Sequence, residues 1–231
     1  MYHIKKRARI KMSALLLLLF LLLVITIYHA NRVLRPQLMA IATQKTNDAI
    51  SMLAQKVLSA IDYDSTSLIY YHYNEEHEIT AVEYDTKALN ALLNQALDIM
   101  DNSLEKAENG EIDPILQEVF FSDGVIYEVP AGYLTGITFL QNYGYRFKIS
   151  MRILNYVNGD LEVESEPYGI NNSIIKIFLN LSIEAEAITA LQNKHIHFEE
   201  KIPLIIQVVN GIVPDYSTTY QAKQNEKEES Y

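Results

Sequence analysis

The side chains best suited to chemistry in this sequence are two histidines near its C-terminus. His195 and His197 are two residues apart, a spacing that puts both imidazoles on one face of a strand, with Glu199 next on that face. Zinc accepts imidazole nitrogens and carboxylate oxygens, but a third ligand is not evident nearby. We therefore expect polar residues on the solvent face of an edge strand, and we predict no metal site.

Two other groups of residues could act on a substrate. Glu184 and Glu186 share a strand face and could be paired catalytic carboxylates, although they lie opposite an apolar stripe and are more simply solvated. Tyr70–Tyr73 could stack on a carbohydrate, but tyrosines are more often core and interface material. The chain has no Cys, which excludes thiol catalysis, and it lacks nucleophile elbows, phosphate-binding glycine loops and zinc-protease helices. We expect no catalytic residues and no cofactor.

The C-terminal half that must position these side chains alternates with the period of a β-strand. One predicted strand covers Phe147–Ile153, and Leu161 and Val163 alternate with glutamates in the next. A three-residue loop at Asn158–Asp160 would set Val157 opposite Leu161 and Arg152 opposite Glu166. The longest strand is predicted over about 175–187. Its partner is predicted over 195–209, where Pro203 indicates an edge strand or a bulge.

The preceding segment is predicted to be mainly helical. Apolar residues recur at steps of three and four over about 36–61, and again from Leu89 to Ala107 in a helix that Asp85 caps and Asn109-Gly110 ends. Between the helices, Ser67–Tyr73 and Ile79–Tyr84 read as two short strands around a turn at residues 74–78. The expected fold is α+β, with an N-terminal membrane anchor helix followed by two amphipathic helices packed on a mostly antiparallel β-sheet.

The N-terminus reads as a membrane anchor. Five cations within residues 1–12 precede an apolar run from Ala14 to Ile27. The positive-inside rule keeps the basic segment in the cytoplasm and sends the rest outside. We prefer an uncleaved anchor to a signal peptide because Tyr28 is bulky for a cleavage site. The predicted parts are a basic cytoplasmic segment (1–12), the span (13–28), a juxtamembrane helix (29–64), an extracytoplasmic domain that packs with it (65–216) and a disordered tail (217–231).

Charge narrows the range of partners. The net charge is −10, and beyond residue 12 the chain carries 14 cations against 29 acids, a net of −15. An exported domain this acidic is a poor candidate for binding nucleic acid. The absence of Cys means that the domain is held by its core alone, which fits a Gram-positive-type envelope.

A set of short motifs in a fixed order resembles the YunB sporulation protein family of endospore-forming bacteria. The motifs are Thr46–Ile50, Asp85 with Asn90, Val129–Gly136, Gly169–Ser173 and Gly211–Tyr216. The resemblance implies a membrane protein that is made in the mother cell, lies in the mother-cell or outer forespore membrane and is needed for spore formation, without an assigned reaction.

Six positions in these motifs are candidate interaction residues. Their simplest role is in tight turns, because glycine suits positions with positive φ or a close backbone approach; a partner-binding loop is the alternative. We expect a structural or assembly protein that binds another envelope protein or itself, by a strand edge near 195–205 or along the first helix. The rival is an enzyme that acts on cell-wall glycan through Glu184 and Glu186. The candidate positions are Gly132, Gly136, Gly169, Asn171, Gly211 and Pro214.

Overall fold

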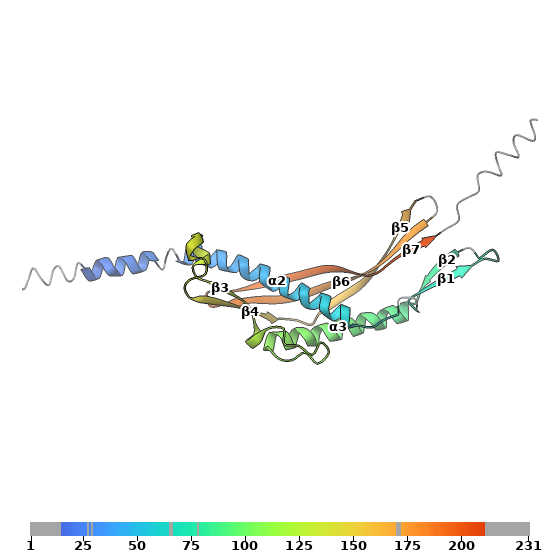
Figure 1. Ribbon diagram of the computed structural model, residues 1–231, viewed down its shortest axis with the longest axis horizontal. Helices are drawn as coiled ribbons and strands as arrows, with labels where there is room; N and C mark the ends of the chain where they lie inside the picture. Colours follow the sequence, from blue (N-terminus) through green and yellow to red (C-terminus); the bar gives the residue numbers. More distant parts are fainter. Residues whose placement is uncertain are drawn as a thin grey trace, which may run out of the picture. The chain divides into compact units, whose positions relative to one another are not determined.

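The computed structural model describes residues 15–26, 28, 30–64, 67–77, 79–169 and 172–210 (Figure 1). It confirms an α+β fold with antiparallel sheets. The chain divides into two compact units. Unit 1 contains residues up to Ala60, Met100–Tyr156 and Ile183–Phe198, and unit 2 contains Ile61–Ile99, Val157–Ser182 and residues from Glu199 onward. The predicted basic segment 1–12 and tail 217–231 lie outside the described residues, and the predicted domain boundaries stay a prediction.

Residues 15–26 form a helix whose apolar side chains are exposed, with Leu17 69% and Val24 45% accessible. Within the described ranges, no helix meets both the length and the hydropathy needed to cross a membrane. The anchor therefore stays a prediction. A short π-helical turn, η1 (Ala30–Leu34), leads into helix α2 (Arg35–Ala60).

Unit 1 is built around α2. The helix buries the stripe that its apolar period predicts, and this stripe packs on strands β3 (Val125–Pro130) and β4 (Arg146–Ile153) and on parts of two longer strands. The helix predicted over 36–61 is therefore confirmed, whereas β3 was not predicted. One buried cluster joins these elements: Leu38, Met39, Ala42, Val129, Leu134, Ile149, Ala187 and Ile196.

The longest strands are β6 (Asn172–Thr189) and β7 (Asn193–Asn210), which pair with each other and appear as long neighbouring arrows in Figure 1. Both match their predictions. Along β6, every second side chain from Ile175 to Ala187 is buried and those between are half-exposed. A strand with one buried face has this period of two.

The hairpin predicted at Asn158–Asp160 is wrong. Strand β4 does not pair with β5 (Asn158–Tyr168); both pair with β6, β4 with its C-terminal part and β5 with its N-terminal part. Arg152 therefore lies opposite Glu186 instead of Glu166, and Leu161 lies opposite Leu179 instead of Val157. The reversal of the chain comes later, where Tyr168 pairs with Asn172.

Gly159 explains the error. Asn-Gly is a strong turn signal, but here both residues lie inside a strand. A Cβ on Gly159 would lie 2.8 Å from the carbonyl oxygen of Asn180 and 3.0 Å from Leu97 Cδ2. The glycine thus permits close packing at this point, the other common reason for glycine in a strand.

Unit 2 contains the small hairpin of β1 (Ile69–Tyr73) and β2 (Ile79–Tyr84), as predicted. Helix α3 (Thr86–Asn109) begins in this unit and ends in unit 1. Asp85 caps it as predicted, because its Oδ1 accepts a hydrogen bond from the amide of Ala88 at 2.9 Å. The helix ends before Gly110, again as predicted.

Candidate functional site: the polar face of the long strands

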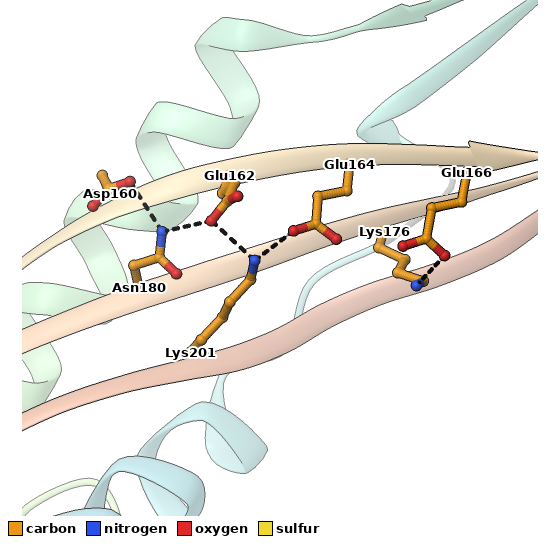
Figure 2. Close-up of polar contacts among 7 residues, drawn as sticks. All are labelled: Asp160, Glu162, Glu164, Glu166, Lys176, Asn180 and Lys201. Carbon is orange, nitrogen blue, oxygen red and sulfur yellow. Dashed lines mark hydrogen bonds and ion pairs between the residues drawn. The ribbon is translucent and has the colours of Figure 1, made fainter.

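The side chains on one face of β5, β6 and β7 are mostly polar or charged, and we call this surface the polar face. Its residues in unit 2 and in unit 1 are described separately. In unit 2 its members are Asp160, Glu162, Glu164, Glu166, Lys176, Asn180 and Lys201 (Figure 2).

Lys201 lies at the centre of this part of the polar face and contacts three of its neighbours. Its Nζ lies 2.5 Å from Glu164 Oε1 and 3.0 Å from Glu162 Oε2, and it sits 4.3 Å from the centre of the Phe178 ring. Figure 2 shows the lysine pointing between the two glutamates of β5. A cation over an aromatic face gains further from the ring's negative charge density. One lysine on β7 is thereby tied to two strands.

Asn180 and Lys176 extend the contacts along β6. Asn180 Nδ2 donates to Asp160 Oδ2 at 3.2 Å and to Glu162 Oε2 at 3.1 Å. Lys176 Nζ lies 2.6 Å from Glu166 Oε2. Each acidic side chain on this stretch of β5 therefore has a donor on β6 or, across β6, on β7.

These contacts shift two pKa values. The pKa of Glu162 is lowered, chiefly by its hydrogen bond from Asn180 and next by the one from Lys201. The pKa of Lys201 is raised by the hydrogen bonds that it donates to Glu164 and Glu162. A carboxyl whose pKa is lower in the folded protein stabilises the fold at a pH above its unfolded-state pKa. This stabilisation is lost as the pH falls through the folded-state pKa. Because the groups are well exposed, water and salt screen the pairs and each contributes little to stability.

In unit 1 the polar face gathers the predicted histidines around one carboxylate. His195 Nε2 lies 2.5 Å from Glu184 Oε2, and His197 Nδ1 lies 2.6 Å from Glu184 Oε1. Glu186 faces Arg152 of β4 at 3.8 Å. The two glutamates proposed as a catalytic pair therefore each contact cationic or imidazole partners on an adjacent strand.

The contact of Glu184 with His195 and His197 was not predicted, although each of the three residues was considered as a candidate functional residue. It depends on the register of a tight turn: Thr189 N donates to Gln192 O at 3.1 Å, which brings Glu184 opposite His197. The turn contains no glycine, proline or asparagine that could signal it. In the described part of the chain, no group of three or more His, Asp or Glu is arranged to hold a metal ion.

The tyrosines considered as a carbohydrate platform are divided between two faces of β1. Tyr70 and Tyr73 are 50% and 59% exposed, whereas burial raises the pKa of Tyr71. Neighbouring residues of a strand point to opposite faces, so the four side chains do not form a single stacking surface.

Three of the candidate glycines, Gly132, Gly136 and Gly169, lie at backbone positions of the kind that favours glycine. Gly136 and Gly169 both adopt φ of +71°, whereas Gly132 has an ordinary φ of −63° and is required by close approach. A Cβ on Gly132 would lie 1.7 Å from the carbonyl oxygen of Leu140. Their part in binding stays a prediction. Asn171, Gly211 and Pro214 lie outside the described residues.

Comparison with known proteins confirms the resemblance to the YunB family. The family described as "Sporulation protein YunB" matches residues 126–216. A curated protein of Bacillus subtilis (strain 168), also named "Sporulation protein YunB", is 22% identical over 195 residues, which cover 83% of this chain and 75% of the relative. No solved structure matches the chain.

Proposed function

We propose, from this likeness to the YunB family, that the chain is a membrane-anchored sporulation protein with an assembly role. Its α+β region would lie outside the cytoplasm, in the space between mother-cell and forespore membranes, and bind another envelope protein. The name of the relative supports the sporulation part, and the remainder rests on the physical properties of the chain.

The N-terminal sequence supports the anchor and its orientation. Five cations precede the apolar run, while only Arg32 and Arg35 follow it within ten residues. This excess of positive charge favours a cytoplasmic N-terminus. The exposed apolar side chains of residues 15–25 are also best explained by a lipid environment, since water disfavours a surface of this kind.

The edge of β7 that no described strand covers is the observation that carries the binding role; one of its carbonyls, Leu204 O, accepts a hydrogen bond from the Tyr63 hydroxyl. In the described part of the chain, β7 pairs with β6 alone, and it includes Pro203, which suits an unpaired edge because it lacks an N–H. Ile206 and Val208 on the same strand are 63% and 47% exposed. An edge strand with apolar side chains can accept a strand from a partner. The apolar stripe of α2, the other surface considered, is already buried in the core of unit 1.

Crosslinking in sporulating cells tests this role. A photoreactive residue at Ile206 or Val208 should capture a defined envelope protein, because a strand added to β7 would lie within about 5 Å of these side chains. The same residue at Glu186 of β6, whose neighbours β4 and β7 are part of the sheet, is the control. Equal capture from all three positions, or none from β7, would contradict the proposal.

The alternative is an enzyme that acts on cell-wall glycan through Glu184 or Glu186. We expect Glu184→Gln, Glu186→Gln, His195→Gln and His197→Gln to leave spore yield nearly unchanged, because these side chains contact one another or Arg152 on a partly exposed face of the sheet. Loss of a general acid or base would instead lower a reaction rate by about 10²-fold or more. Spore counts of the four variants, at matched protein levels, decide between the assembly role and the enzyme. A large loss of spore yield in only one of the two glutamate variants would favour the enzyme.

A further inference from the structure

Residues 131–145, which we call the aromatic loop, expose a group of apolar side chains. No Asp, Glu, Lys or Arg occurs in this segment, in a chain of which 21% is charged. The loop contains the short helices η4 (Tyr133–Thr135) and η5 (Thr138–Leu140). Its exposed side chains are Tyr133 (53%), Ile137 (42%), Phe139 (77%), Tyr143 (70%) and Tyr145 (67%).

The backbone of the aromatic loop is closed by its own hydrogen bonds. Ala131 N donates to Tyr145 O at 2.7 Å and Gly132 N donates to Tyr143 O at 2.9 Å, which joins the two ends of the loop. Leu134 is 1% exposed and fixes the loop to the core of unit 1. Compact loops of this kind are often functional, and here the backbone holds the aromatic rings outward.

The aromatic loop lies at the N-terminal end of α2. Leu134 belongs to the same cluster as Leu38, and Leu34 of η1 packs against that cluster. Figure 1 places the loop beside the start of α2. Leu34 follows Tyr28 by only six residues, so in sequence the loop's contact with the core lies close to the apolar run.

We propose that the aromatic loop inserts its exposed rings into the headgroup region of the membrane that holds the apolar helix. Tyrosine favours this region because its ring can rest against acyl chains while its hydroxyl stays hydrated, and the apolar ring of Phe139 can insert beside the acyl chains. Arg32 is exposed close to the same end and can meet lipid phosphates. The absence of charge in the loop fits a lipid surface, into which charged groups enter at high cost. The inference rests on the proposed anchor.

The chain contains no Trp, so a single introduced Trp reports on the loop without background. The test compares Phe139→Trp with Tyr156→Trp in the full-length chain. Tyr156 is 81% exposed and follows the opposite end of β4, about 25 Å along the strand. Both proteins are reconstituted in vesicles of phosphatidylethanolamine and phosphatidylglycerol with brominated acyl chains, which quench Trp near lipid.

Phe139→Trp should be quenched at least about threefold more strongly than Tyr156→Trp, because only the first site would lie in the interface. Flotation of the same samples measures anchoring separately. Protein that floats while both positions are quenched equally, or neither is, overturns the loop proposal and leaves the anchor standing. Protein that does not float overturns both.

Discussion

Gly132→Ala should lower the free energy of unfolding by at least about 3 kcal/mol, the upper range for forcing extra atoms into a packed site. The new Cβ would lie 1.7 Å from Leu140 O and 2.8 Å from Tyr143 O. Both are backbone atoms of the aromatic loop, which cannot move aside as a flexible side chain can. Denaturation of the detergent-solubilised full-length chain, followed by circular dichroism, measures the loss.

Gly136→Ala in the same loop is the matched control. Gly136 has a left-handed φ of +71°, but a Cβ there would meet nothing within 4 Å. The variant should cost only the left-handed backbone penalty of about 1 kcal/mol. A Gly132→Ala variant as stable as Gly136→Ala would show that the loop is not closed as described, and would remove the support for its rigid presentation of Phe139.

Replacing Leu18 and Leu22 together with Arg should abolish membrane association and reduce spore yield to that of a strain lacking the protein. These residues lie one helical turn apart within the apolar run. Each arginine near the centre of a span costs about 3 kcal/mol, so two oppose insertion by roughly 6 kcal/mol, or more than about 10⁴-fold. Membrane fractionation and spore counts measure the two effects.

The double substitution of Leu18 and Leu22 by Ile controls for the loss of leucine while preserving hydropathy. It should fractionate and sporulate normally. A double-Arg protein that stays in the membrane fraction would contradict the anchor. One that leaves the membrane yet sporulates normally would show that anchoring is not needed for the function.

The elements predicted best were those whose signals are local. The two long helices follow from apolar residues at three- and four-residue steps, and α3 also has a cap at Asp85 and a stop at Gly110. The alternation in β6 is strict enough to give its buried face residue by residue. Such patterns depend only on neighbours in sequence, so no knowledge of tertiary structure is needed to read them.

The errors concern pairing between strands. Asn158-Gly159 was interpreted as a turn between β4 and β5, whereas both strands pair with the later strand β6. The residues next to Gly159 in sequence do not show whether it lies in a turn or packs closely against Leu97. The contact of Glu184 with His195 and His197 was missed for a related reason. It depends on the register between β6 and β7. That register is set by the turn at Thr189–Gln192, which contains none of the residues that usually mark a turn.

The interleaving of the two units along the chain bears on how such a protein can evolve. The chain passes between units five times, after Ala60, Ile99, Tyr156, Ser182 and Phe198, and three of these passages fall inside α3, β6 and β7. No single cut separates the units whole. Neither can be gained or lost by fusion or truncation of a gene, so insertions and substitutions are the routes left for divergence. The alignment with the Bacillus subtilis relative covers 83% of this chain, more than either unit alone supplies, so it includes parts of both units.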